Sequence, residues 1–274
     1  MSELNREVVE DLKSPLARRV ELHEEMGSTQ KRARELARGG APHGTLVISR
    51  VQTGGRGRLG RRWGSPAGGL WMSLVLRPNI STKAAARTTQ TAAVGVAKTL
   101  RDFGVETRIK WPNDLLVEGR KICGILAESS AESVSVAAKR AGHRAGPGRP
   151  LDFIVLGVGL NANLDPQDLG VRDQEVTTMR SELGHDVDLL ELLESLLSHL
   201  DAELGRMENF GAVLDNWRAL NCTLGDRVRV RRFGEVLEGI ALDLGPEGEL
   251  LLETRDGVVE LFEGEIEQLR QGRI

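Results

Sequence analysis

The longest apolar run of the chain extends from Phe153 to Leu160 and constrains the fold more than any other segment. It is far shorter than the roughly 20 residues that a helix needs to span lipid. A continuous apolar run of strand length is typical of a strand that is covered on both faces. We therefore expect Leu151 to Gly159 to form a central, buried strand of a sheet.

Apolar spacing elsewhere predicts helices and further strands. The expected helices are Gln30–Arg38, Ala84–Phe103, Asp188–Leu204 and Asn209–Leu220. Ser28 or Thr29 can cap the first of these helices, and Gly39-Gly40 can end it. The expected strands are Thr45–Val51, Leu70–Leu76, Thr107–Trp111, Leu115–Val117 and Lys121–Glu128.

After Cys222 the pattern changes to short β segments that glycine-containing turns separate. The segments are Arg227–Arg232, Val236–Asp243, Glu249–Glu253 and Val258–Phe262. A stretch of this kind predicts a small all-β barrel. We therefore expect a short N-terminal arm in residues 1–20, a large domain in residues 21–221 and a small domain in residues 222–274. Residues 129–150 are rich in Ser, Ala, Gly and Pro, and we expect an exposed insertion there.

Composition limits the classes of function. The net charge of −3 favours neither a nucleic-acid partner nor an anionic membrane. Charged residues throughout the first twenty positions leave no space for the apolar core of a signal peptide. Cys123 and Cys222 lie far apart and form no CxxC pair, which argues against a disulfide framework and a cysteine-rich zinc site. We expect a cytoplasmic protein with no membrane partner and no protein-held metal.

A glycine- and arginine-rich loop from Gly54 to Trp63 is the first candidate site. Its glycines allow the backbone to approach a ligand closely, and its arginines supply forked positive donors. Such a loop suits a carboxylate and a phosphate whose mutual repulsion must be neutralised. It is no Walker loop, because no Gly-Lys-Ser/Thr follows, and its spacing is wrong for a dinucleotide fingerprint. A solvated basic loop or an RNA-binding segment is the alternative interpretation.

Three further segments carry candidate chemistry. Lys110-Trp111-Pro112-Asn113-Asp114 presents an amide and a carboxylate beside an aromatic ring, although ordinary turns use the same residue types. Lys121 begins the next apolar strand, where Gly124 leaves room for its ammonium to reach a phosphate, and the alternative is an ordinary lysine at a strand edge. Small residues from Gly157 to Asn163 end the buried strand, as they would at any strand–turn junction.

In this order, the Ser28-Thr29 pair, the glycine–arginine loop and these three segments resemble the biotin protein ligases, or biotin–[acetyl-CoA-carboxylase] ligases. The resemblance implies an α+β fold, with a mixed sheet flanked by helices that is related to class II tRNA synthetases and lipoate ligases. It also implies a small C-terminal SH3-like β-barrel. The implied reaction joins biotin and Mg-ATP into biotinyl-5′-AMP and pyrophosphate, and then transfers the biotinyl group to a lysine of a biotin carboxyl carrier protein.

The resemblance also implies roles for particular residues. The catalytic residues would be Lys121, Arg58 and Asp114. The residues in contact with biotin would be Ser28, Thr29, Gln30, Gln52, Gly55, Arg56, Gly57, Arg58, Lys121 and Gly124. The residues in contact with ATP or the adenylate would be Arg56, Arg58, Arg61, Trp63, Lys110, Asn113, Asp114, Lys121 and Asn161. Asn113 and Asp114 would either contact Mg-ATP or handle the proton of the incoming amine.

The resemblance adds two expectations and one departure. The loop of residues 54–62 would close over the adenylate as a lid, because water must be kept from a reactive mixed anhydride. Trp63 and the strand at Leu70–Leu74 would wall the ring and the valeryl chain of biotin. Gln30 stands where the family usually has Asn, and its amide is longer.

Other functions remain as alternatives. A lipoate or octanoyl ligase would share the fold, but lipoate has no ureido group for Ser28, Thr29 and Gln52 to bind. An RNA-binding module would use the arginine loop, but the aromatic fraction is only 3% and stacking platforms need aromatic rings. A biotin-responsive repressor needs about three packed helices, for which residues 1–20 are too few, so no DNA partner is expected. Either a monomer or a homodimer fits the sequence.

Overall fold

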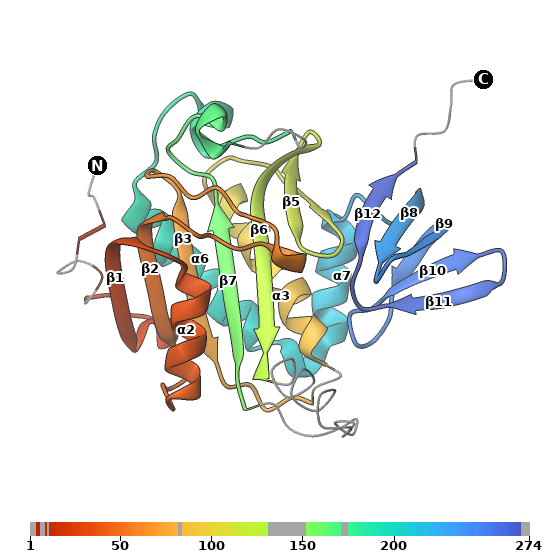
Figure 1. Ribbon diagram of the computed structural model, residues 1–274, viewed down its shortest axis with the longest axis horizontal. Coiled ribbons are helices and arrows are strands. Elements are labelled where there is room, and N and C mark those ends of the chain that lie inside the picture. Colours follow the sequence, from red (N-terminus) through yellow and green to blue (C-terminus); the bar gives the residue numbers. More distant parts are fainter. Residues whose placement is uncertain are drawn as a thin grey trace.

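Two β-sheets organise the part of the chain that the computed structural model describes, namely residues 4–5, 9, 11–81, 84–130, 152–170 and 175–269. The larger sheet has seven strands in the order β1-β2-β3-β7-β6-β5-β4 (Figure 1). In that order the strands are β1 Arg19–Met26, β2 Thr45–Gln52, β3 Leu70–Leu76, β7 Ile154–Leu160, β6 Arg120–Ser129, β5 Asp114–Val117 and β4 Arg108–Lys110. Strands β1 and β2 are parallel, and the other neighbouring strands are antiparallel.

The apolar run lies where the sequence predicts it, at the centre of this sheet. Strand β7 pairs with β3 on one side and β6 on the other. Its alternate residues enter two different apolar clusters, since Val155 packs with Ala33 and Ala37 while Leu156 packs with the main core. Both faces of the strand are therefore covered, which explains why its sequence does not alternate between apolar and polar residues.

Helices cover both faces of the large sheet. Helix α2 (Thr29–Arg38) lies on one face, and α3 (Ala85–Asp102), α6 (Leu189–Leu204) and α7 (Phe210–Leu220) lie on the other (Figure 1). These four helices agree closely with the predicted ones. Asp188 caps α6 by accepting from the backbone N–H groups of Leu190 and Glu191, and Ser28 caps α2. A short helix, α5 (Met179–Leu183), and several 3₁₀ turns complete the helical part of the described chain.

The N-terminal prediction is wrong at its boundary. The predicted arm of residues 1–20 overlaps the large sheet, because β1 begins at Arg19, and Leu16 is buried in the 3₁₀ turn Pro15–Ala17. Leu4 is also buried, and its carbonyl accepts a hydrogen bond from Arg50. The sequence did not predict strand β1, because it is an edge strand whose charged residues give it little apolar character.

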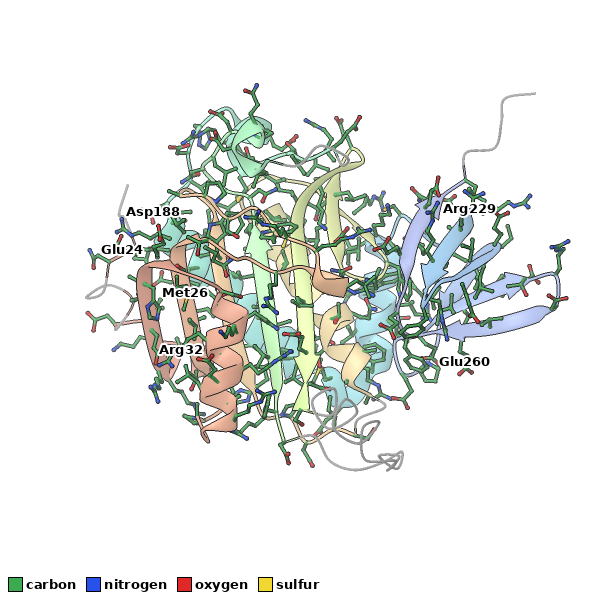
Figure 2. The ribbon with its side chains drawn as sticks, viewed as in Figure 1. Glu24, Met26, Arg32, Asp188, Arg229 and Glu260 are labelled. Carbon is green, nitrogen blue, oxygen red and sulfur yellow. The ribbon has the colours of Figure 1, made fainter. Side chains whose placement is uncertain are left out.

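A five-stranded antiparallel sheet in the order β11-β10-β9-β8-β12 forms the C-terminal part of the described chain. Its strands are β8 Arg227–Arg232, β9 Glu235–Leu244, β10 Leu250–Thr254, β11 Gly257–Leu261 and β12 Glu265–Gln268. Four of them match the predicted segments, and this part has the expected SH3-like character. The fifth strand, β12, was not predicted. Figure 2 places Arg229 and Glu260 on this sheet, at the opposite end of the molecule from Met26 and Arg32.

The expected insertion lies almost wholly outside the described residues. Strand β6 extends to Ser129, and Ser130 donates its backbone N–H to the carbonyl of Phe153. Residues 131–151 are not described. Leu151, with which the predicted central strand begins, is among them.

Candidate active site

The floor of the site is the face of the large sheet that α2 covers. Strand register places Ser73 of β3 opposite Gly157 of β7, and Gly159 of β7 opposite Gly124 of β6. A Cβ atom built on Gly157 would lie 2.6 Å from Oε1 of Gln30, and one on Gly159 would lie 2.6 Å from Nε1 of Trp63. Small residues here therefore make room for the polar and aromatic groups above the sheet.

A polar cluster occupies one end of this floor. Gln52 accepts hydrogen bonds at Oε1 from the backbone N–H and the hydroxyl of Thr29, at 2.8 and 3.1 Å. The hydroxyl of Thr29 also lies 2.9 Å from that of Ser73. The hydroxyl of Ser28 accepts from the backbone N–H of Lys31, at 3.4 Å. Three of the residues predicted to bind the head of biotin are thus brought together, and Ser73, which the sequence did not indicate, joins them.

The beginning of the glycine–arginine loop closes over this cluster. The backbone N–H of Gly54 donates to the carbonyl of Gly27 at 2.8 Å, which brings the loop against the turn before α2. A Cβ atom on Gly55 would lie 2.5 Å from the carbonyl oxygen of Trp63 and 2.6 Å from Oγ of Ser65. Only glycine fits such a close approach of two chain segments.

Lys121 and Trp63 lie together over the glycine floor. The ammonium of Lys121 is 4.9 Å from the centroid of the Trp63 ring and 2.6 Å from Oδ1 of Asp114. A Cβ atom on Gly124 would lie 3.0 Å from the same ring. The aromatic face and the carboxylate hold the positive charge in place in a largely buried position.

Arg58 reaches the same region from the loop. Its Nη1 donates to Oδ1 of Asn113 at 3.1 Å and to the carbonyl of Gly264 at 3.3 Å. Burial lowers the pKa of this guanidinium, and the charge of Asp114 opposes that effect. The residue remains a cation at neutral pH, since an arginine pKa lies far above 7. Asn113 in turn donates from Nδ2 to the carbonyl of Ile125 at 2.7 Å, so Arg58 is connected through Asn113 to strand β6.

Other predicted residues occupy different positions. Arg61 pairs with Glu265 of β12, and the exposed Arg56 lies in a backbone bridge with Arg62. Lys110 lies near Cys222, where its charge opposes the larger effect of burial, which raises the pKa of that thiol. In this structure Arg61 and Lys110 are therefore turned toward the C-terminal part of the chain.

Asn161 and Gln30 are held by the protein itself. The buried amide of Asn161 donates to the carbonyls of Thr177 and Lys121, at 3.0 and 3.4 Å, and thereby fixes the backbone of the lysine. The amide nitrogen of Gln30 donates to Glu128 and to the carbonyl of Val155, and its oxygen accepts from Ser73.

A groove of about 630 Å³ adjoins Arg58. The loop residues Arg56–Gly60, the first turns of α3 and the second half of β6 form its walls, together with Phe262 and Glu263 of the C-terminal part. Trp111 does not line it. This ring is buried between the two sheets, and its backbone N–H donates to the hydroxyl of Thr223 at 3.0 Å.

A mixed sheet with helices on both faces, a floor of glycines and the cations Lys121 and Arg58 beside it fit an acyl-group ligase of the biotin and lipoate class. Residues 24–139 match the model of the biotin/lipoate A/B protein ligase family, and residues 223–268 match the model of the biotin protein ligase C terminal domain.

Individual relatives agree. The bifunctional ligase/repressor BirA of Bacillus subtilis is 34% identical over 250 residues, which cover 89% of this chain and 72% of that protein. The biotin–[acetyl-CoA-carboxylase] ligase of Paracoccus denitrificans is 33% identical over 82% of this chain and 90% of its own length. The solved structure of the Aquifex aeolicus biotin protein ligase in complex with biotin and ATP superposes with a TM-score of 0.72 at 26% identity, over 93% of this chain and 100% of that one. The chain belongs to the biotin protein ligase family.

Proposed function

We propose that this chain activates biotin with ATP to biotinyl-5′-AMP and then transfers the biotinyl group to a lysine of a biotin carboxyl carrier protein. The observation that carries the proposal is the position of Lys121, whose ammonium lies over the ring of Trp63 and beside Asp114, on the glycine floor that the sheet provides. A bound acid whose head reaches the cluster would direct its carboxylate toward this cation. The residue roles below belong to the same proposal.

The head of biotin is a neutral ureido group with two N–H donors and one carbonyl acceptor. Thr29 and Gln52 offer oxygen atoms to the donors, and the hydroxyl of Ser28 keeps a hydrogen for the carbonyl because its oxygen accepts from Lys31. A dithiolane head would leave these buried polar groups without partners, and that loss strongly disfavours an analogue. This arrangement favours biotin over lipoate as the acid.

The first step brings two anionic groups into contact. A carboxylate oxygen of biotin forms a bond to the α-phosphorus of ATP, and the bond from that phosphorus to the bridging oxygen of pyrophosphate breaks. Lys121 neutralises the carboxylate and the α-phosphate, and Arg58 neutralises the phosphates from the loop. Fixed cations of this kind lower an electrostatic barrier without reorganising during the reaction.

Magnesium enters as part of Mg-ATP. Among the described residues, no group of three or more His, Cys, Asp or Glu side chains is placed to hold a metal. We propose an ion that the phosphate oxygens carry, with Asp114, beside Lys121, as a carboxylate that could contact it. Magnesium typically binds to substrate phosphates with one or two protein carboxylates.

In the second step the amine of the carrier lysine attacks the carbonyl carbon of the mixed anhydride. The carbon–oxygen bond to AMP breaks, an amide forms and the amine loses a proton. Asp114 lies beside Lys121 and Asn113 beside Arg58, and either handling of that proton or binding of Mg-ATP is compatible with their contacts. Burial under the loop excludes water, which would otherwise hydrolyse the anhydride.

The remaining proposals concern the domain boundary, the partner protein, the oligomeric state and the cellular location. The catalytic domain ends near residue 221, since the five-stranded sheet begins at Arg227. The partner is a carrier domain that presents a lysine, and either a monomer or a homodimer could act on it. No described helix is both long and apolar enough to cross a membrane. A cytoplasmic location suits the two reduced cysteines.

Pyrophosphate exchange into ATP tests the function. Wild-type protein should catalyse exchange that depends on biotin and not on lipoate, and Lys121→Ala should abolish most of it. Lys31→Ala removes an exposed lysine of α2 and serves as the matched control, which should retain full exchange. Exchange with lipoate alone would keep the reaction class and overturn the substrate. A lack of exchange with either acid would overturn the proposed activity.

A further inference from the structure

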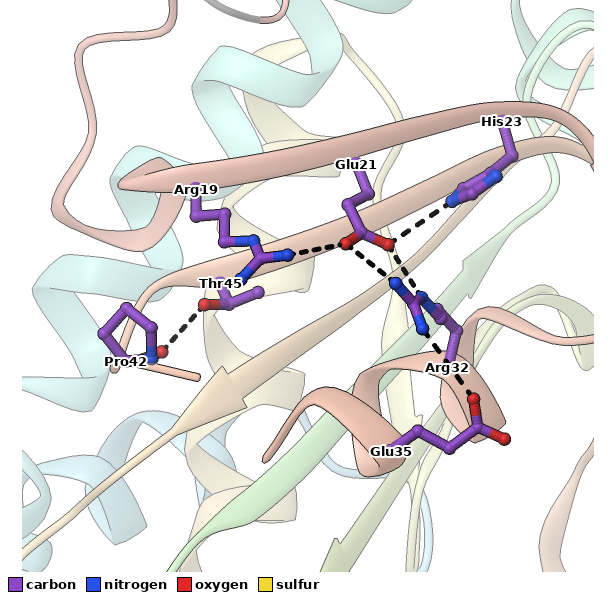
Figure 3. A network of polar contacts seen from close by, with 7 residues as sticks. All are labelled: Arg19, Glu21, His23, Arg32, Glu35, Pro42 and Thr45. Atoms are coloured by element: carbon purple, nitrogen blue, oxygen red, sulfur yellow. Dashed lines mark hydrogen bonds and ion pairs between the residues drawn. The ribbon is translucent and has the colours of Figure 1, made fainter. Parts of the chain in front are cut away.

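Helix α2 is fastened to the large sheet by two glutamates on opposite sides. Glu21 of β1 receives a bidentate contact from Arg32, at 2.8 and 3.1 Å, and is also approached by Arg19 and His23 (Figure 3). Glu128 of β6 receives Arg34 at one carboxylate oxygen and Gln30 at the other. Of these two attachments, the one through Glu128 and Gln30 also contacts the polar cluster of the site, because Gln30 accepts a hydrogen bond from Ser73.

Gln30 and Arg34 lie four residues apart and therefore share one face of α2. Three acceptors surround the amide nitrogen of Gln30: Oε2 of Glu128 at 2.9 Å, the carbonyl of Val155 at 3.1 Å and that of Leu126 at 3.4 Å. An amide oxygen in this position would face three other oxygens. The nitrogen must therefore lie toward Glu128, and the amide oxygen toward Ser73.

This orientation fixes the hydroxyl groups beyond it. Ser73 donates to Oε1 of Gln30 at 3.0 Å and thereby commits its one hydrogen. The one hydrogen of the Thr29 hydroxyl then has two acceptors, Oε1 of Gln52 at 3.1 Å and the hydroxyl oxygen of Ser73 at 2.9 Å. In this structure Thr29 donates to Gln52, and a ligand N–H that took over the contact to Gln52 would allow the hydrogen of Thr29 to turn to Ser73. Two hydroxyl hydrogens serve three contacts, and a ligand N–H between Thr29 and Gln52 would supply the missing one.

We propose that Glu128 and Gln30 are positioning residues that orient the Thr29 hydroxyl as an acceptor for a ureido N–H. The carboxylate orients the amide of Gln30, the amide orients Ser73, and Ser73 orients Thr29. The inference rests on the proposed function, because it takes biotin as the acid. It assigns Gln30 an indirect role instead of direct contact with biotin, and it introduces Glu128 and Ser73 as determinants of specificity.

Steady-state pyrophosphate exchange measures the effect. Ser73→Ala and Glu128→Ala should each raise the KM for biotin, by about tenfold for the first, which corresponds to one hydrogen-bonded group of ordinary strength. The KM for ATP should stay within about twofold for Ser73→Ala, because Ser73, unlike Glu128, does not line the groove beside Arg58. Glu128→Gln keeps an acceptor oxygen for Gln30 and should restore most of the biotin affinity.

A double-mutant cycle separates a relay from independent contacts. If Glu128 acts through Ser73, then the Ser73→Ala/Glu128→Ala protein should show about the same KM for biotin as Ser73→Ala alone. Multiplication of the two single effects would overturn the proposal. Wild-type exchange that does not depend on biotin would instead contradict the proposed function, so the two failures are distinguishable.

Arg32→Gln provides the structural control, because it breaks the other attachment of the same helix. This variant should lower the Tm while its KM for biotin stays near that of the wild-type protein. A lower Tm for Glu128→Ala with no change in the KM for biotin would reduce Glu128 to an attachment of α2 and overturn the proposal.

Discussion

The ammonium of Lys121 lies 2.6 Å from Oδ1 of Asp114, and the two residues come from neighbouring strands of the large sheet. Asp114 begins β5 and pairs with Gly124 of β6, so strand register brings the carboxylate beside a lysine that lies three residues before its backbone partner. The side chains of this pair are 11% and 19% exposed, so water screens the attraction only weakly. The site is thus organised around a cation whose position the sheet itself determines.

Asp114→Asn should reduce biotin-dependent pyrophosphate exchange by about tenfold or more, because the lysine loses its charged partner and its fixed orientation. The amide keeps the size of the side chain, so the fold should be retained. Asp256→Asn, in the exposed turn between β10 and β11, is the matched control and should leave exchange unchanged. Equal activity of Asp114→Asn and the wild-type protein would show that the pair is not needed for adenylation.

Local patterns predicted most elements of this fold. The central strand, the helices α2, α3, α6 and α7, and four strands of the small sheet follow from apolar periodicity and from capping residues. Strand β1 could not be found in this way, since its charges reflect an edge position that only the assembled sheet defines. Strand β12 has four residues and no apolar alternation of useful length.

The sequence indicated which residue types form the candidate site, but it did not indicate the directions in which their side chains point. The resemblance assigned Ser28, Thr29 and Gln52 to one group, and in the structure Thr29 contacts Gln52 while Ser28 caps α2 next to them. Their contact with biotin stays a prediction. Ser73 was missed because its relation to Thr29 depends on contact across 44 positions of sequence. The direction of Arg61 toward Glu265, and the bond from Arg58 to Gly264, likewise depend on how the C-terminal part packs against the loop.

Gly159→Ala should impair binding of biotin with little loss of stability. The new methyl group would lie 2.6 Å from Nε1 of Trp63, so the ring must leave its present position beside Lys121. We expect the KM for biotin to rise by about tenfold, the effect of about 1.4 kcal/mol. The measurement is pyrophosphate exchange at varied biotin together with thermal unfolding. Unchanged kinetics would show that the ring has no role above this glycine.

Gly211→Ala, in contrast, should stabilise the fold and leave the binding of biotin unchanged. This glycine lies in α7 with no atom closer than 4.0 Å to an added Cβ, so alanine fits without strain. The substitution should raise the free energy of unfolding by about 0.4–1 kcal/mol, because alanine restricts the unfolded chain more than glycine does. Denaturant unfolding measures the gain, and exchange kinetics should not change. A destabilised protein would mean that the helix start does not tolerate the methyl group.

The loop of residues 54–62 should become protected when biotin and ATP bind together. Arg56, Arg61 and Arg62 are exposed, and each is a site for trypsin. Arg255, in the turn between β10 and β11, is also exposed and serves as an internal control. Cleavage in the loop should slow on addition of both substrates, while cleavage at Arg255 keeps its rate. Equal rates at the loop with and without substrates would count against a lid.

Acid should weaken the attachment of α2 to β1. The hydrogen bond and the charge of Arg32 hold the pKa of Glu21 below its usual value, against the raising effect of burial. A depressed carboxyl pKa contributes stability at neutral pH, and this contribution is lost as the pH falls through the folded-state pKa. The wild-type protein should therefore be more stable than Glu21→Gln at pH 7. The difference in the free energy of unfolding between the two proteins should decrease as the pH falls from about 5 toward 3, near the ordinary range of glutamate pKa values. Denaturant unfolding at a series of pH values checks this expectation, and a difference independent of pH would show that the carboxylate charge does not hold the helix.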